Sequence, residues 1–222
     1  MPRKYPLVTG EVYHIYSRSI ANFKIFNNDR DFQRMLMLFY YFQMENPPTK
    51  FSYFIRNKEA EGIGFFPAVD ILAKDQSKIV QLIAYCLMPT HIHLILKQKS
   101  EQGISKFMKN VLDGYTRYFN TCHQRKGPLW EGRFKNVLIE SDEQLFHSTR
   151  YFHLNPTTAS LVKKPQDWEF SSYLEYLGDE NQRKFCDYDG LLEINPKQYK
   201  KFVEDRVGYQ KELGKIKNLR ID

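Results

Sequence analysis

The chain has 222 residues, of which 42% are hydrophobic and 15% aromatic, enough for one substantial domain with a core and an extension. These proportions exclude a disordered chain, and no apolar run approaches the roughly 18 residues of a membrane span. The formal net charge of +7 favours a polyanionic partner, with nucleic acid ahead of a membrane surface. The sequence shows no signal peptide and no Cys-x-x-Cys pair, so we expect a cytoplasmic protein without a disulfide framework or a thiolate zinc site.

The first predicted elements are a strand and a helix. Residues 11–17 (EVYHIYS) are rich in β-branched and aromatic residues and predict the strand. His14 has no partner at a motif spacing, so a packed or surface position is favoured over a role as a ligand. Residues 28–45 predict a helix with an apolar stripe and a possible cap at its first residue.

The stretch from residue 46 to residue 77 has no clear period. We interpret it as an insertion between core elements, with residues 50–56 (KFSYFIR) as an added strand or hairpin arm.

Two histidines stand one residue apart within residues 85–97 (YCLMPTHIHLILK). Pro89 ends a first strand, and the short connection that follows predicts a hairpin whose second strand begins at His91. Strand side chains alternate between faces, so His91 and His93 point to the same side. Two imidazoles on one face can share a divalent metal ion, although histidines that only form hydrogen bonds in a sheet are common.

The second half of the chain predicts a helix over residues 103–123, a strand over residues 133–140 and a helix that starts at residue 142. The last helix begins with a capping box, in which Ser141 caps an amide and Gln144 reaches back. We expect it to end near Leu154, because Pro156 biases the preceding residue away from the helical region.

The order strand, helix, strand, strand, helix, strand matches the split βαβ, ferredoxin-like arrangement. We therefore expect an α+β fold, with an antiparallel sheet, helices on one face and a helical C-terminal extension. The predicted division is a catalytic domain over residues 1–160, which contains the insertion at residues 46–77, and an extension over residues 161–222 that packs on the core.

A helical wheel of the capped helix places Tyr151 and Asn155 on a polar arc, together with Gln144, His147 and Ser148. This arrangement indicates that the His pair and an amide oxygen hold a divalent ion, which polarises a phosphodiester while a tyrosine attacks phosphorus. The alternatives are a packed tyrosine for Tyr151, a helix C-cap amide for Asn155 and a packing role for His147. Tyr115 and Tyr118 lie on an apolar stripe and are predicted to pack against the sheet.

Basic side chains gather in the sequence around the loop that precedes the last strand. A solvated charged face is the usual reason for such a cluster, but Trp130 and Phe134 interleave with it, which suits phosphate contact and base stacking on single strands. Glu131 could anchor an arginine or contact a base. The predicted DNA contacts are Arg117, Lys126, Trp130, Arg133, Lys135 and Arg150.

Five stretches in this order resemble the single-tyrosine HUH transposases, most closely the REP-associated tyrosine transposases: YHIYSRS (residues 13–19), YCLMPTHIHLIL (85–96), GPLWEGRFKNVLI (127–139), RYFHLNP (150–156) and DWEFSSY (167–173). The resemblance implies a bacterial enzyme with a ferredoxin-like core that cleaves single-stranded DNA near a hairpin, using Mg²⁺ or Mn²⁺. By position it implies His91, His93 and Asn155 as metal ligands and Tyr151 as the nucleophile that forms a 5′-phosphotyrosine.

The sequence therefore predicts a DNA strand-transferring endonuclease that acts on single-stranded or hairpin DNA, as a monomer or homodimer without a membrane partner. One alternative is a module of the same fold that binds structured single-stranded DNA without cutting it. Another is a metal-dependent hydrolase that uses activated water, with Tyr151 in a structural role.

Overall fold

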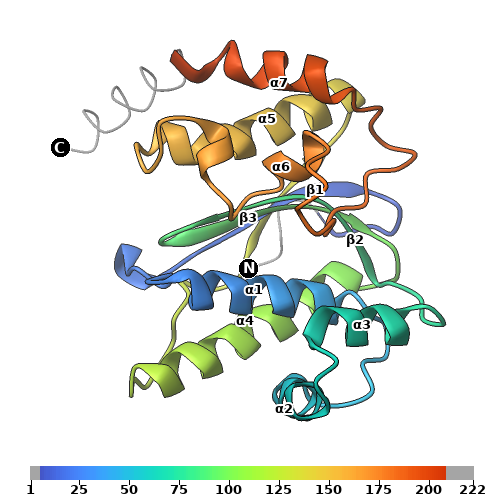
Figure 1. Ribbon diagram of the computed structural model, residues 1–222, viewed down its shortest axis with the longest axis vertical. Helices are drawn as coiled ribbons and strands as arrows, with labels where there is room; N and C mark the ends of the chain where they lie inside the picture. Colours follow the sequence, from blue (N-terminus) through green and yellow to red (C-terminus); the bar gives the residue numbers. More distant parts are fainter. Residues whose placement is uncertain (1–5, 209–222) are drawn as a thin grey trace.

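The computed structural model describes residues 6–208 and, within them, the side chains of all residues except 58–60. One antiparallel sheet has helices on both faces (Figure 1). Its strands are β1 (Val12–Arg18), β2 (Val80–Met88), β3 (His91–Gln98) and β4 (Lys135–Ile139). The α-helices are α1 (Asp29–Phe42), α2 (Phe51–Glu61), α3 (Phe65–Ala73), α4 (Gly103–Cys122), α5 (Asp142–Thr158), α6 (Tyr173–Tyr176) and α7 (Pro196–Glu204), and the 3₁₀ turns are η1 (Ile20–Asn22) and η2 (Pro165–Asp167).

The strand order β2-β3-β1-β4 confirms the predicted α+β class with a ferredoxin-like sheet. Helices α1 and α4 pack on one face, as expected for the two crossover helices. The expectation of helices on one face holds only for these two, because α5 and α6 lie against the opposite face and α7 packs over α5 (Figure 1). Two hydrophobic clusters, one on each side of the sheet, therefore stabilise the fold.

Alternation along β1 determines which side chains meet α5. Tyr13 and Ile15 are buried in the cluster beneath α1 and α4. His14 points to the other face, where its ring centroid lies 4.9 Å from that of Phe152 in α5. The face of the sheet that carries His14 is thus the face covered by α5.

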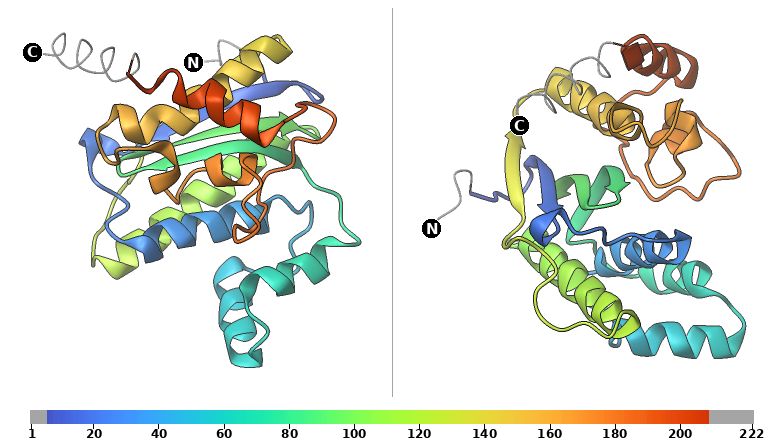
Figure 2. Two further views of the ribbon diagram at one scale, coloured as in Figure 1. Left: turned by 45° about the horizontal axis from the view of Figure 1, so that its top comes forward. Right: turned by 90° about the vertical axis from the view of Figure 1, so that its left-hand side faces the viewer.

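The interpretation of residues 46–77 as irregular, with an added strand at residues 50–56, is wrong. This segment forms α2 and α3, which project from the sheet beside α1 (Figure 2). Phe51 and Phe54 are three residues apart and both pack on Tyr41 of α1, with ring centroids 5.4 and 5.0 Å away. Aromatic residues at this spacing also alternate well enough to suggest a strand, and tertiary packing favours the helix.

Helix α5 continues four residues beyond the predicted end at Leu154 and contains Pro156. Ser141 caps it by accepting from the Gln144 amide (3.1 Å), as predicted, whereas the Gln144 side chain reaches one residue past the N-cap and accepts from the Glu140 amide (2.8 Å). Pro156 has no N–H group, so it removes one hydrogen bond from the last turn of the helix. Beyond the helix end, the Ala159 amide donates to the Asn155 carbonyl (2.9 Å).

The extension after residue 160 contacts α5 through a buried hydrogen-bond network. Tyr199 of α7 places its hydroxyl 2.7 Å from His153 Nδ1 and donates to Thr149 Oγ1 (2.8 Å). The last fourteen residues of the extension, 209–222, lie outside the described residues. Within residues 6–208, no helix is both long and apolar enough to cross a membrane.

Candidate active site

The two histidines of β3 lie side by side on the face covered by α5. Their ring centroids are 4.9 Å apart, as the predicted alternation requires. Thr90 Oγ1 lies 2.9 Å from His91 Nδ1, so a hydrogen bond at Nδ1 leaves Nε2 of His91 available. The His93 side chain is buried with 8% exposure.

His14 orients His93 from the neighbouring strand. Its Nε2 lies 3.0 Å from His93 Nδ1, at hydrogen-bond distance. The contact occupies one ring nitrogen of His93 and leaves the other, Nε2, available. A hydrogen bond on the far nitrogen is the usual support of a metal-binding imidazole.

Burial keeps all three imidazoles neutral at physiological pH. Desolvation lowers the pKa of His14 to about 4. The same effect, with the charge of Arg18 as a smaller cause, lowers the pKa of His91 to about 4. Desolvation, followed by the charges of His91, His14 and Arg18, lowers the pKa of His93 well below its ordinary value. Neutral imidazole is the form that binds a metal ion.

Tyr151 lies beside the His pair with its ring partly open to solvent. Its ring centroid is 6.0 Å from that of His93, and the side chain is 38% exposed. Burial of the remainder raises the pKa of the phenol, an effect that Arg18 partly opposes. The Tyr115 hydroxyl instead donates to the Ile25 carbonyl (2.7 Å), and that of Tyr118 to Asp31 (2.9 Å), on the opposite face of the sheet.

Asn155 lies one turn after Tyr151 on α5. It lies inside α5 rather than at its C-cap, and its side chain is 8% exposed. Its buried Nδ2 has no hydrogen-bond partner within the described part of the chain. Amide nitrogen and oxygen exchange by rotation of the side chain, so an unpaired buried amide can present its oxygen to an ion.

No group of three His, Cys, Asp or Glu side chains that could hold a metal ion occurs among the described residues. The amide oxygen of Asn155 is of a kind that hard divalent cations accept.

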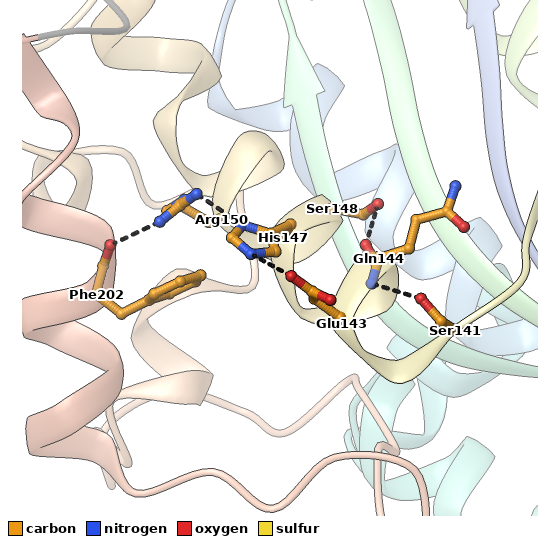
Figure 3. Close-up of polar contacts among 7 residues, drawn as sticks. All are labelled: Ser141, Glu143, Gln144, His147, Ser148, Arg150 and Phe202. Atoms are coloured by element: carbon orange, nitrogen blue, oxygen red, sulfur yellow. Dashed lines mark hydrogen bonds and ion pairs between the residues drawn. The ribbon is translucent and has the colours of Figure 1, made fainter.

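His147 and Arg150 lie against Phe202 of α7 (Figure 3). His147 lies 3.8 Å from Glu143 and 2.7 Å from Arg150, contacts that suit the packing role considered for it. The Arg150 guanidinium stacks 4.0 Å from the Phe202 ring centroid. This contact helps to hold α7 on α5, and the DNA contact of Arg150 stays a prediction.

The prediction that Trp130 stacks on DNA bases is wrong. Trp130 is 8% exposed and belongs to the hydrophobic cluster beneath α4. Its Nε1 donates to Thr116 Oγ1 (3.1 Å) and is 3.3 Å from the Leu112 carbonyl. An amphipathic ring in a basic loop looks alike in sequence whether it is exposed or folded back on a helix.

The remaining predicted DNA contacts divide between two places. Arg133 and Lys135 are exposed and line a cavity of about 450 Å³ together with Arg18 of β1. Lys126 is exposed in the loop after α4, and Arg117 is exposed on α4 itself, which covers the opposite face of the sheet. The structure thus brings Arg133 and Lys135 to the face that carries His91 and His93, but not Arg117.

The sequence reasoning missed the roles of His14, Tyr16 and Arg18. All three occupy alternate positions of β1, so they share one face. The predicted topology already placed β1 next to β3. What it lacked was the register, in which Tyr16 pairs with His93 and Arg18 with His91.

Comparison with known proteins finds similarity to transposases. Residues 70–155 match the family model described as "Transposase IS200 like". A curated putative REP-associated tyrosine transposase from Haemophilus influenzae is 27% identical over 103 residues, which cover 42% of this chain. The match spans 58% of that relative's own length.

A solved structure of a REP-associated tyrosine transposase bound to a REP hairpin superposes with a TM-score of 0.53 and 14% identity, covering 88% of this chain and 99% of the other. At this identity the superposition establishes the shared fold alone. Residues 70–155 therefore carry the IS200-like transposase pattern, and the predicted resemblance of the chain to the REP-associated tyrosine transposases is confirmed.

Proposed function

We propose that this chain cleaves and rejoins single-stranded DNA beside a hairpin through a covalent bond to Tyr151. The observation that supports this proposal best is the position of the Tyr151 ring, 6.0 Å from that of His93 and open to solvent. The similar protein of known structure is described as bound to a REP hairpin, which makes hairpin DNA the substrate to test first.

Nε2 of His91, Nε2 of His93 and the amide oxygen of Asn155 would hold a divalent ion such as Mg²⁺ or Mn²⁺. A bound ion supplies Lewis-acid polarisation and orientation of a phosphodiester. The chain prepares this site by keeping both imidazoles neutral and by occupying their Nδ1 atoms with Thr90 and His14.

The chemical step of the proposal is a transesterification at phosphorus. Tyr151 Oη forms the new bond to phosphorus, and the bond from phosphorus to the 3′ oxygen of the preceding nucleotide breaks. The phenolic proton is lost to solvent, and the departing oxygen becomes a 3′ hydroxyl by taking one. The 5′ phosphate stays on Tyr151, so its bond energy is kept and a second 3′ hydroxyl can reverse the step without ATP.

Tyr151 is suited to attack by its place on α5. The helix places the Tyr151 ring beside His93. The next residue, Phe152, packs with its ring centroid 5.4 Å from that of the same imidazole and so helps to hold α5 against His93. Burial raises the pKa of Tyr151 above its ordinary value of about 10, so the free hydroxyl carries its proton near pH 7.

The test is incubation of the full chain with end-labelled hairpin DNA that has single-stranded flanks, in Mn²⁺, followed by a denaturing gel. We expect a protein–DNA adduct with the natural chain and with Tyr118→Phe, a control on the opposite face of the sheet. Tyr151→Phe should bind the DNA and form no adduct. DNA binding without any adduct would indicate a non-cleaving module, and cleavage without an adduct would indicate a hydrolase that uses water.

A further inference from the structure

A cavity of about 450 Å³ opens beside the His pair, within the range of about 300–1,000 Å³ usual for ligand sites. Its walls come from the end of β1, the loop before β4 and the start of β4. The lining residues are Tyr16, Ser17, Arg18, Glu131, Gly132, Arg133 and Lys135. We call it the β1–β4 pocket.

The β1–β4 pocket lies on the same face of the sheet as the proposed metal site. Directly opposed residues of an antiparallel pair project to one face. Arg18 opposes His91, and Tyr16 opposes both His93 in β3 and Lys135 in β4. The ring centroids of Tyr16 and His93 are 6.3 Å apart. A DNA strand bound at His91 and His93 would therefore reach the pocket within one nucleotide.

The pocket combines three cationic side chains with a single carboxylate, that of Glu131. Among the described residues, this carboxylate forms no ion pair with the three cations of the pocket. Glu131 is exposed, and within the described part of the chain its side chain has no hydrogen bond or ion pair. Its backbone amide donates to the Arg18 carbonyl (3.0 Å), which fixes the loop against β1. The anchored loop thus holds the carboxylate of Glu131 inside a basic pocket. A carboxylate repels phosphate, so a pocket that bound phosphate groups alone would not need one.

Base edges explain why a carboxylate stands among cations. Arginine donates in pairs to the O6 and N7 acceptors of guanine, whereas a carboxylate accepts from base N–H groups. Guanine offers both sets, with its N1–H and N2 amine side by side on one edge and O6 and N7 on the next. Thymine offers a carboxylate a single N–H group, and adenine and cytosine each offer one amine.

We propose that the β1–β4 pocket binds one unpaired guanine of the DNA flank next to the cleaved phosphate. Glu131 accepts from N1–H and the N2 amine, the guanidinium of Arg18 or Arg133 donates to O6 and N7, and Lys135 contacts the adjoining phosphate. The inference rests on the proposed function, because it names the base that the same DNA strand presents.

The test measures binding without cleavage, using Tyr151→Phe as the parent protein and hairpin oligonucleotides with one flank. Each flank position is varied through the four bases to find a position at which guanine binds tightest. Guanine there is then replaced by inosine, which lacks only the N2 amine. We expect inosine to weaken binding about tenfold, the effect of one hydrogen bond to a charged group.

The same pair of oligonucleotides is compared in Glu131→Ala and Glu131→Gln, each added to Tyr151→Phe. Both should bind guanine and inosine within about twofold of each other, because the partner of the N2 amine is lost or weakened. The changed residue is exposed, so thermal melting should match the parent protein. Lys126→Ala, a cation outside the pocket, should keep the difference between guanine and inosine.

A guanine-to-inosine difference that persists in Glu131→Ala would overturn the assignment, and so would the absence of any position that prefers guanine. If the natural chain binds hairpin DNA and forms the Tyr151 adduct in those cases, the proposed function stands and only this inference falls. If no hairpin DNA is bound at all, both fall.

Discussion

His14 Nε2 and His93 Nδ1 lie 3.0 Å apart, across the boundary between β1 and β3. This contact occupies Nδ1 of His93 and leaves its Nε2 available. His14 itself also packs against Phe152, with ring centroids 4.9 Å apart, and is thereby held in place. The proposed metal site therefore depends on a side chain that is not itself a ligand.

Removing His14 should weaken metal binding while the ligands remain. We expect His14→Ala to lower the affinity for Mn²⁺ about 10- to 100-fold, since His93 loses its orienting partner. His14→Gln, which can place an amide near the same position, should recover part of the loss. Isothermal titration of metal-free protein measures both, and an unchanged affinity in His14→Ala would show that His93 needs no support.

The buried position of Trp130 leads to a prediction about stability rather than DNA. Trp130→Phe loses the hydrogen bond to Thr116 and should lower the free energy of unfolding by about 1–2 kcal/mol. The dissociation constant for hairpin DNA should not change. Urea unfolding measures the stability and DNA titration measures the affinity. Weaker DNA binding with unchanged stability would show that the Trp130 ring contacts DNA.

The two faces of the sheet should differ in their contribution to DNA binding. Neutralised phosphates release counterions, so each contact steepens the dependence of affinity on salt. Arg133→Ala and Lys135→Ala should each reduce the slope of log affinity against log salt by about one. Arg117→Ala, on α4, should leave the slope unchanged. Equal slopes in all three variants would place the DNA path elsewhere.

A buried carboxyl makes stability depend on pH. Glu175 accepts hydrogen bonds from the Phe185 and Cys186 amides (2.8 Å each), yet burial raises its pKa to about 7. The folded pKa exceeds the unfolded value of about 4.3, so protonation of Glu175 stabilises the fold. The stabilisation is complete below about pH 4.3 and is lost as the pH rises through about 7.

The free energy of unfolding of the natural chain should therefore fall by about 2 kcal/mol between pH 5 and pH 8, because the buried carboxyl ionises. Glu175→Gln, which does not ionise, should remove that part of the pH dependence. Urea unfolding at both pH values measures it. Identical pH profiles for the two proteins would show that Glu175 titrates normally in the folded state.

Local periodicity explains which parts of the molecule could be predicted. Alternation at His91 and His93 required only that residues 91–98 form a strand, and the capping box at Ser141 identified the start of α5. Both signals depend on neighbours in sequence. The element order was then sufficient to specify the sheet.

The errors come from contacts between residues distant in sequence. Residues Phe51 and Phe54 are helical because that conformation packs both rings on Tyr41. Trp130 is buried because Thr116 and Leu112 of α4 accept from its ring nitrogen. The role of His14 depends on the register between β1 and β3, which strand propensity does not specify.

The wheel of α5 succeeded only in part for a related reason. It grouped His147 with Tyr151, but the packing of α7 draws His147 and Arg150 toward Phe202 (Figure 3). A wheel gives directions around a helix, whereas the neighbours that occupy each direction come from the tertiary fold.

The most direct test of the proposed mechanism is to map the residue that carries DNA after cleavage. Trypsin should release Tyr151 in a peptide of residues 151–163, which contains no other tyrosine, whereas Tyr16 falls in the peptide of residues 5–18. Mass spectrometry of the nuclease-trimmed adduct should find the nucleotide on residues 151–163. A nucleotide on residues 5–18, or on the α4 peptides of residues 110–117 and 118–125, would contradict Tyr151 as the nucleophile.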